Sequence, residues 1–193
     1  MDNFIKILKE DDFNISTWSG GKTTELFIYP EDAEYSKKNF KVRISSATVE
    51  LDTSNFTKLD GVYRFISPLD GNLKLTHKGD EFISLDPFQV YEFEGNIDTT
   101  SFGKVKDFNL MLANGATGQL KSFFIDEKKE IIILANYGLN ILYSFDSLFR
   151  ISIDEEEIML NPNEILVLKS DSVKNIKIQS NNSSNILLSS IVV

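Results

Sequence analysis

The strongest constraint on the fold is a series of short segments in which apolar and polar residues alternate. Val, Ile, Phe, Tyr and Thr are frequent in these segments, and Gly, Asn, Asp and Pro separate them. A period of two residues is typical of half-buried β-strands, and the separating residues favour turns. Because no long amphipathic helical pattern interrupts the series, the sequence predicts an all-β sandwich or barrel.

The expected strands form two groups on either side of a turn-rich junction at residues 114–118. The first group lies near 23–29, 40–49, 63–69, 73–77, 82–85, 89–93 and 107–112. The second lies near 120–125, 130–135, 139–145, 149–153, 157–160, 165–169, 176–179 and 186–193. One helical turn is expected, at the N-terminus.

The two groups resemble each other in the order of their strands and turns. Asp70-Gly71 and Asp86-Pro87 separate strands of the first group, and Tyr137-Gly138 and Asn161-Pro162 do so in the second. Gly supplies the positive φ of a hairpin turn and Pro presets a turn, so the match has a physical basis. A duplicated barrel explains it, although any β-meander has similar turns. We expect two domains, residues 1–115 and 116–193.

Composition and charge exclude several classes of function. The 193 residues are 41% hydrophobic and 25% charged, as in ordinary globular proteins with a sizeable core. A net charge of −9 repels nucleic acid and anionic lipid, so neither is an expected partner. The absence of Cys excludes disulfides and thiolate chemistry. Without a signal-peptide pattern or an apolar run near ~20 residues, a soluble cytoplasmic protein is expected.

Charged residues occupy mid-strand positions where a buried face is expected. In 40–49, Arg43 and Ser45 alternate with Val42 and Ile44, and alternate residues of a strand point to opposite faces. We expect residues 23 and 25 to share a face with Phe27. The polar side chains that other strands of the first group contribute are Thr23, Glu25, Arg64, Asp107 and Asn109.

If these strands line one barrel, two guanidinium groups, two carboxylates and an amide converge inside it. Buried charges are tolerated when they are paired and hydrogen-bonded, so the set must either satisfy itself or be completed by a ligand. Arg is well suited to bidentate binding of a carboxylate, which points to a small anionic ligand. A structural network of Arg and acidic side chains with no ligand is the alternative.

Two other motifs carry less information. The segment 18–25 contains Gly20-Gly21-Lys22-Thr23 but lacks the spacing of a phosphate-binding loop and precedes no helical pattern. Its two glycines are expected to let the backbone pass close to Trp18. His77 is the only histidine, whereas a barrel metal site of the usual kind needs about three. We expect no metal, no cofactor and no catalytic role for His77, which is interpreted as a partly exposed residue at a strand end.

Several of these segments together resemble the HutD/Ves family in order and spacing. The resemblance covers roughly residues 15–115, and the second half is similar only in its strand layout. The sequence departs from the family pattern at Lys41, at Asp52-Thr53-Ser54 and at Tyr63. The segments that carry the resemblance are Trp18-Ser19-Gly20-Gly21-x-Thr23-x-Glu25-Leu26, Phe40-x-Val42-Arg43-Ile44-Ser45-x-Ala47-x-Val49, Phe56-x-x-Leu59-x-Gly61-Val62-x-Arg64 and Asp107-Phe108-Asn109-Leu110-Met111.

The resemblance implies a bicupin, that is, two fused cupin-like barrels, without a catalytic metal set. It implies a role linked to histidine utilisation or to cold and stress response, with regulation and binding of a small carboxylate rather than an established enzymatic activity. Because Lys41 and Tyr63 flank the two Arg positions, ligand identity stays open. The residues that the resemblance assigns to the pocket are Thr23, Glu25, Arg43, Ser45, Arg64, Asp107 and Asn109.

Three functions are compatible with these observations. The first is a regulatory module in which the two Arg side chains bind a carboxylate metabolite. The second is a metal-free isomerase or lyase with Glu25 or Asp107 as general base; two nearby Arg side chains would lower the pKa of that carboxyl group, which argues against it. The third is a structural or protein-interaction role. Exposed strand edges would also allow a homodimer.

Overall fold

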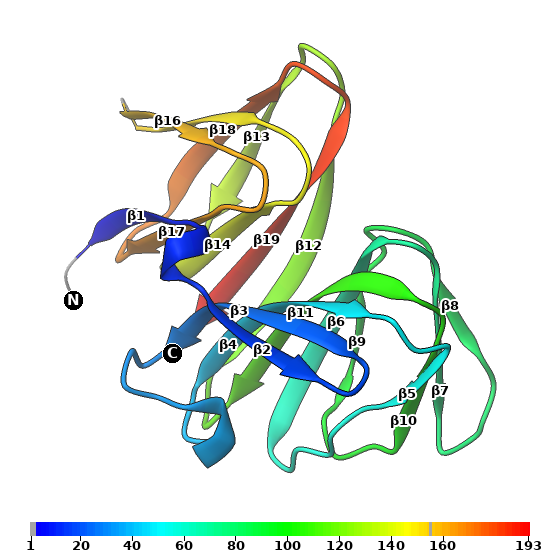
Figure 1. The fold of residues 1–193 in the computed structure, drawn as a ribbon. Coiled ribbons are helices and arrows are strands. Elements are labelled where there is room, and N and C mark those ends of the chain that lie inside the picture. Colours follow the sequence, from blue (N-terminus) through cyan, green and yellow to red (C-terminus); the bar gives the residue numbers. More distant parts are fainter. Residues whose placement is uncertain (1–2, 155) are drawn as a thin grey trace. The chain divides into compact units, whose positions relative to one another are not determined.

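The computed structural model describes residues 3–154 and 156–193. Within these ranges the chain forms β-strands and two short 3₁₀ helices, Glu10–Asp12 and Tyr35–Lys37, and it has no α-helix (Figure 1). The prediction of an all-β fold is confirmed. No helix among the described residues is long and apolar enough to cross a membrane.

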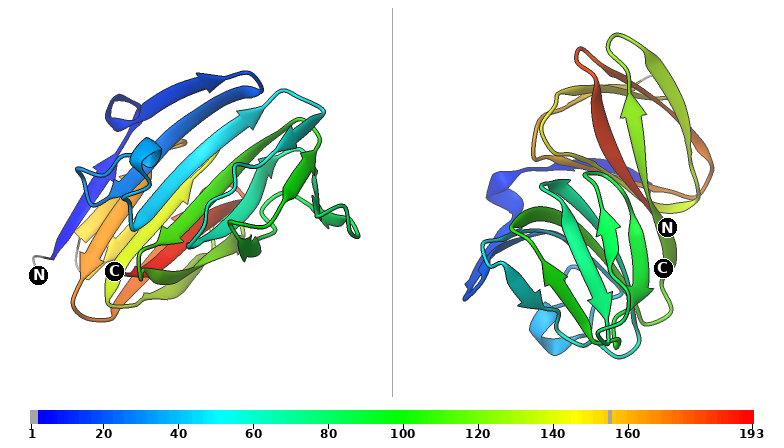
Figure 2. Two further views of the ribbon diagram at one scale, coloured as in Figure 1. Left: turned by 90° about the horizontal axis from the view of Figure 1, so that it is seen from below. Right: turned by 90° about the vertical axis from the view of Figure 1, so that its right-hand side faces the viewer.

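The chain divides into two compact units, each with two facing sheets (Figure 2). The first unit is Phe13–Thr117, and the second is residues 3–12 together with Gly118–Val193. In the first unit a six-stranded sheet has the order β2 (Asn14–Trp18), β3 (Gly21–Tyr29), β4 (Val42–Val49), β11 (Val105–Ala113), β6 (Val62–Asp70), β9 (Tyr91–Glu94). The opposing sheet has the order β5 (Thr53–Asn55), β10 (Thr99–Phe102), β7 (Leu73–His77), β8 (Ile83–Leu85).

The second unit repeats this two-sheet plan with its own strands. One sheet has the order β1 (Phe4–Leu8), β17 (Ile165–Ser170), β14 (Gly138–Ser144), β19 (Ser184–Val192), β12 (Thr117–Ile125). The other has the order β13 (Glu130–Ala135), β18 (Lys174–Ser180), β15 (Phe149–Ile153), β16 (Glu156–Leu160). Pairing is antiparallel between β1, β17, β14 and β19 of the first of these sheets, and between all neighbouring strands of the second.

The N-terminal segment differs from its expected place. The expected helical turn is present as the 3₁₀ helix Glu10–Asp12. We expected residues 1–115 to form the first domain, but Phe4–Leu8 is a strand that pairs with β17 of the second unit. Ile5 and Ile7 pack against the core of that unit. The physical reason is that alternation specifies a strand and its buried face but does not specify which sheet edge the strand joins. The junction between the units, after Thr117, lies within the expected turn-rich segment.

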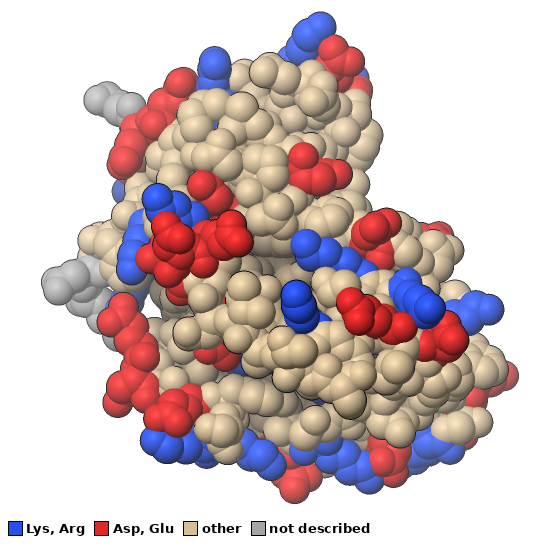
Figure 3. Space-filling model, viewed as in Figure 1, with Lys and Arg blue, Asp and Glu red and all other residues tan. Residues whose placement is uncertain are grey.

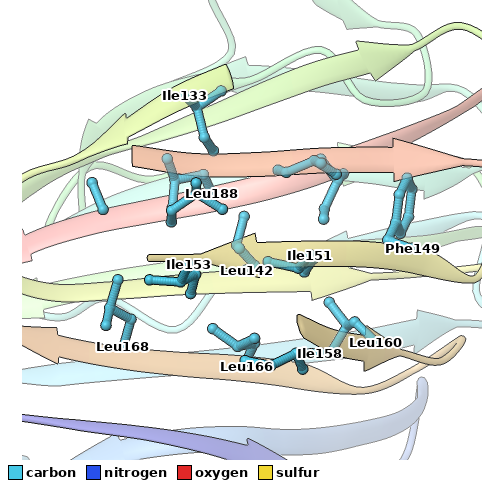
Figure 4. Close-up of a cluster of buried hydrophobic side chains, with 14 of the residues drawn as sticks. Ile133, Leu142, Phe149, Ile151, Ile153, Ile158, Leu160, Leu166, Leu168 and Leu188 are labelled. Carbon is cyan, nitrogen blue, oxygen red and sulfur yellow. The ribbon is translucent and has the colours of Figure 1, made fainter. Parts of the chain in front are cut away.

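The two interiors differ in chemistry. The space between the sheets of the second unit is filled by Ile, Leu and Phe side chains, including Leu142, Phe149 and Leu166 (Figure 4). The charged side chains that are buried among the described residues are Arg43, Arg64 and Asp107, and all three lie in the first unit. Elsewhere, basic and acidic side chains are interspersed on the surface, as on the face shown in Figure 3. The first unit is therefore the one whose interior could bind a polar or charged ligand.

Leu142→Ala tests the packed interior of the second unit. Leu142 is fully buried, so the variant should lose about 2–5 kcal/mol of unfolding free energy through lost burial and a residual cavity. Leu134→Ala is the matched control, because Leu134 is 62% exposed on β13 and its loss should change stability by about 0.5 kcal/mol or less. Urea denaturation followed by circular dichroism measures both; equal losses would contradict the assignment of this core.

Candidate functional site

The first unit contains a cavity of about 360 Å³. Six of the seven residues predicted for the pocket line it, and Glu25 alone among them does not. The predicted residues on the wall are Thr23, Arg43, Ser45, Arg64, Asp107 and Asn109. The wall is completed by Ser16, Trp18, Tyr35, Ala47, Val49, Ser54, Asn55, Phe56, Thr57 and Met111.

Strand register explains why residues far apart in sequence meet at this cavity. Directly paired residues of an antiparallel sheet project from the same face. The six-stranded sheet therefore presents rows of side chains to its inner face. The three rows that carry the site are Arg43, Met111 and Arg64; Glu25, Ser45 and Asn109; and Thr23, Ala47 and Asp107.

A bulge in β3 corrects one expectation about this face. The register between β3 and β4 shifts between Glu25 and Phe27, so that Glu25 pairs with Ser45 whereas Phe27 pairs with Ile44. Ser45 and Ile44 point to opposite faces, so Phe27 does not share the face of Glu25. One extra residue in a bulge reverses the alternation beyond it, and the sequence pattern gave no signal of that insertion.

Two glycines allow the hairpin between β2 and β3 to pack closely, as expected. A Cβ atom on Gly20 would lie 2.0 Å from the Trp18 ring. Gly21 has a φ of +144°, and a Cβ there would lie 1.9 Å from the Thr48 carbonyl oxygen. A larger residue at either position would displace Trp18 or the backbone of β4.

Arg43 is held by partners of the protein itself. Its Nε donates a hydrogen bond to Glu25 Oε2 at 2.6 Å, and its Nη1 donates to Ser45 Oγ at 3.2 Å. The guanidinium carbon lies 4.1 Å from the centroid of the Tyr35 ring. The Arg43 and Glu25 side chains are 8% and 17% exposed, so this ion pair is largely desolvated. Glu25 thus acts as the counter-charge of Arg43, although it does not itself line the cavity.

Arg64 is buried without a counter-charge. It is 7% exposed, and no carboxylate oxygen of the described residues lies within 4.0 Å of its guanidinium nitrogens. Nη1 donates a long hydrogen bond of 3.4 Å to the Thr57 carbonyl, whereas Nε has no hydrogen-bond partner among the described residues. The guanidinium carbon lies 4.7 Å from the Phe56 ring centroid and 5.4 Å from that of Phe93. Burial lowers the pKa of Arg64 to about 10, so it stays protonated near neutral pH.

Asp107 is the buried carboxyl group of the cavity. It is 3% exposed and accepts a hydrogen bond of 2.6 Å from Asn109 Nδ2. Desolvation by burial raises its pKa to about 7, against the opposite effects of Asn109, of the Arg64 charge and of the Ala47 backbone. The expectation that nearby Arg side chains would keep this carboxyl pKa low is therefore wrong for Asp107, because the cost of burying its charge exceeds their attraction.

Sequence reasoning missed two aromatic residues of the wall, Tyr35 and Phe56. Tyr35 comes from a 3₁₀ helix and Phe56 follows the short strand β5, so neither belongs to a long alternating pattern. Phe56 stood in one of the motifs that suggested the family, but no residue pattern assigned it to the pocket.

His77 lies away from the cavity wall, at the end of β7. Its ring nitrogens lie 2.9 Å from Thr99 Oγ1 and 2.9 Å from Tyr91 Oη. It also packs on the rings of Tyr91 and Phe93, and burial lowers its pKa. The described residues contain no group of three or more His, Cys, Asp or Glu side chains that could hold a metal ion.

The raised pKa of Asp107 predicts how stability depends on pH. The folded state retains a proton that the unfolded state releases, so the unfolding free energy should fall as pH rises from about 4 to above 7, at up to about 1.4 kcal/mol per pH unit. Asp107→Asn should lack this part of the decline and should be the more stable protein at high pH. Asp52→Asn, at a side chain that is 93% exposed, is the control. Urea denaturation across this pH range measures the difference; parallel curves for the wild type and Asp107→Asn would refute the assignment.

Comparisons with known proteins show a close match in fold and a weak match in sequence. A conserved protein of unknown function from Pseudomonas aeruginosa has a TM-score of 0.87 and 20% identity, covering 98% of this chain and 100% of that one. HutD from Pseudomonas fluorescens has a TM-score of 0.76 and 20% identity, with 98% of both chains covered. A bacterial pirin from Escherichia coli, in complex with nickel(II), has a TM-score of 0.66 and 8% identity, covering 96% of this chain and 98% of that one. At these identities the likenesses establish the fold.

The family assignment rests on sequence. None of the curated proteins compared with the chain matches it. The sequence profile of the HutD family matches residues 10–188, which is most of the chain and includes both units. The expected bicupin architecture is confirmed by the solved structures, among them HutD and pirin. The chain therefore belongs to the HutD family, and its two units are the two cupin-like barrels of a bicupin fold.

Proposed function

We propose that the chain binds a small carboxylate metabolite in the cavity of the first unit and acts through that binding as a regulatory protein. The observation that carries the proposal is the buried guanidinium of Arg64, which lines the cavity and has no counter-charge among the described residues. The family resemblance supports a link to histidine utilisation or stress response. Any regulatory role depends on ligand binding, and the contacts of Arg64 are the observation that supports such binding.

Burying the charge of Arg64 has an energetic cost. A desolvated charge is tolerated in proteins when hydrogen bonds and an opposite charge compensate for lost hydration. Arg64 has one long hydrogen bond and two aromatic neighbours, and its Nε–H is unused. A carboxylate in the cavity would supply the counter-charge and accept the free N–H, and a planar guanidinium suits that geometry.

The two arginines have different expected roles. Arg43 is already neutralised by Glu25, so it adds little net attraction for an anion and instead holds the wall in place. Arg64 is the anion-binding group. Ser45 and Asn109, in the row between Arg64 and Asp107, offer further polar contacts for the body of the ligand.

A thermal-shift screen with Arg64→Met tests the proposal. The probes are histidine, urocanate, formylglutamate, glutamate and formate; formate is included as the smallest carboxylate and because the Pseudomonas fluorescens HutD structure is of a formate condition. A probe at about 100 times its Kd should stabilise the wild type by about 2.7 kcal/mol. Arg64→Met should lose this stabilisation, because Met replaces the aliphatic part of the Arg side chain but has no guanidinium group and no charge.

Arg150→Met is the matched control, since Arg150 lies on the second unit with a side chain that is 54% exposed. This variant should keep the full thermal shift. In the absence of ligand, Arg64→Met should be no less stable than the wild type, because it removes a buried charge that lacks a counter-charge. A full shift retained in Arg64→Met would refute the pocket, and a flat screen of the wild type across all probes would favour a structural or protein-interaction role.

A metal-free isomerase or lyase is the second candidate, and one observation favours it. A general base works best when its pKa lies near the working pH, and burial brings the pKa of Asp107 to about 7. Arg64 would then stabilise negative charge that develops on the substrate. Turnover of any bound probe, with a rate that rises through a pKa near 7 and is abolished in Asp107→Asn, would establish this function; bound probes recovered unchanged would exclude it for them.

A further inference from the structure

Two opposite charges line the same cavity without pairing. Arg64 and Asp107 are 7% and 3% exposed, and both contribute to the cavity wall. Neither forms an ion pair within 4.0 Å with any described residue, and so they do not pair with each other. In a purely structural network, oppositely charged buried groups gain most by direct contact. The arrangement keeps them apart.

Strand register shows how they are separated. Arg64 on β6 is opposite Met111 of β11, and Asp107 lies four residues before Met111 on the same strand. Four residues span roughly 14 Å of an extended strand. The row between them carries Ser45 and Asn109 on the inner face. The cavity therefore has a cationic end and an acidic end, with neutral polar groups between.

The other ionisable groups at the cavity leave this polarity unchanged. The Arg43 charge, on β4, is compensated by Glu25 of β3. Tyr35, from the 3₁₀ helix, packs its ring on Arg43. On β11, Asn109 is a neutral donor to Asp107. An incoming molecule therefore meets one uncompensated guanidinium, that of Arg64, and one buried carboxyl group, that of Asp107.

A simple carboxylate does not satisfy both ends. Bound at Arg64, it would supply the missing counter-charge. It would also bring a second negative charge into the cavity that contains Asp107, and this raises the free energy needed to ionise Asp107. A molecule with a carboxylate at one end and a protonated or N–H-bearing nitrogen at the other would pair with both groups. It would also replace their lost hydration with charge-assisted hydrogen bonds.

We propose that the ligand of this cavity is a short dipolar molecule whose carboxylate binds Arg64 and whose nitrogen donates to Asp107. This inference rests on the proposed carboxylate-binding function and specifies the class of carboxylate. The amide of Asn109, which already donates to Asp107, holds that carboxyl group in place for the ligand nitrogen. Asp107 is thus the group that discriminates between carboxylates.

The ionisation of Asp107 near neutral pH also supports a ligand with a donor nitrogen. An ammonium group binds the ionised carboxylate, and in the protein without ligand Asp107 is only about half ionised near pH 7. Affinity for a dipolar ligand should therefore increase as pH rises from about 6 to 8. A carboxylate without a donor nitrogen would show the opposite trend, because its binding would require a proton on Asp107.

Matched acids with and without a terminal amine test the proposal by calorimetric titration at about pH 7.5. The pairs are 3-aminopropanoate with propanoate, 4-aminobutanoate with butanoate, and 5-aminopentanoate with pentanoate, so that the separation of carboxylate and amine varies along the series. In the wild type, at least one of the amino acids should bind roughly ten-fold or more tightly than the matched acid without an amine. A hydrogen bond to a charged group usually contributes enough free energy for a difference of this size.

Asp107→Asn should abolish this preference, because the amide keeps the shape and can still accept from Asn109 but carries no charge. Asp52→Asn, at an exposed side chain, should retain it. Equal affinities within every pair in the wild type, or an amine preference that survives in Asp107→Asn, would overturn the dipolar ligand while leaving carboxylate binding intact. If no acid of either series binds at any pH, carboxylate binding fails together with it.

Discussion

The site depends on the desolvation of Arg64 and Asp107. Both side chains are more than nine-tenths buried at one cavity, and neither has an oppositely charged partner among the described residues. Loss of hydration disfavours the charged form of each, which is why the pKa of Arg64 falls to about 10 and that of Asp107 rises to about 7. Such an arrangement costs stability, and the second unit avoids that cost by filling the equivalent space with apolar side chains.

The six-stranded sheet makes this arrangement possible. Antiparallel pairing of β3, β4, β11 and β6 aligns their inward side chains in rows. Hydrophobic side chains of the same inner face, among them Ile66 and Val105, pack against the opposing sheet and help to fix the register. The ion pair between Arg43 and Glu25 then neutralises one of the two guanidinium groups within the wall. Among the described residues, the cavity wall then has one guanidinium without a counter-charge and one buried carboxyl group, in rows separated by the row of Ser45 and Asn109.

Much of the cavity wall could be predicted from the alternation of apolar and polar residues alone. The inward positions of Arg43, Ser45, Asp107 and Asn109 follow from a period of two within unbroken strands, and those residues line the cavity. Long-range features could not be predicted in the same way. The pairing of β1 with β17 depends on which sheet edge is free, and the bulge after Glu25 depends on local backbone geometry that leaves no mark in the hydrophobic pattern. Tyr35 and Phe56 line the cavity from irregular segments, where no alternating pattern predicts which way a side chain points. Two further features depend on distances that only the fold supplies. One is which Arg side chain is neutralised by a carboxylate, and the other is whether desolvation or the attraction of nearby Arg charges determines the pKa of Asp107.

If the Arg64 guanidinium is held without a counter-charge so that a ligand carboxylate can bind it, its free Nε–H must gain an acceptor on binding. The most direct measurement is the ¹⁵N NMR signal of the Arg64 Nε–H group, assigned by its loss in Arg64→Met, during titration with 4-aminobutanoate and formate. We predict that the signal shifts in a saturable way and that its hydrogen exchange slows as the N–H gains an acceptor. A signal that stays unchanged while either probe binds the protein would contradict this role for Arg64.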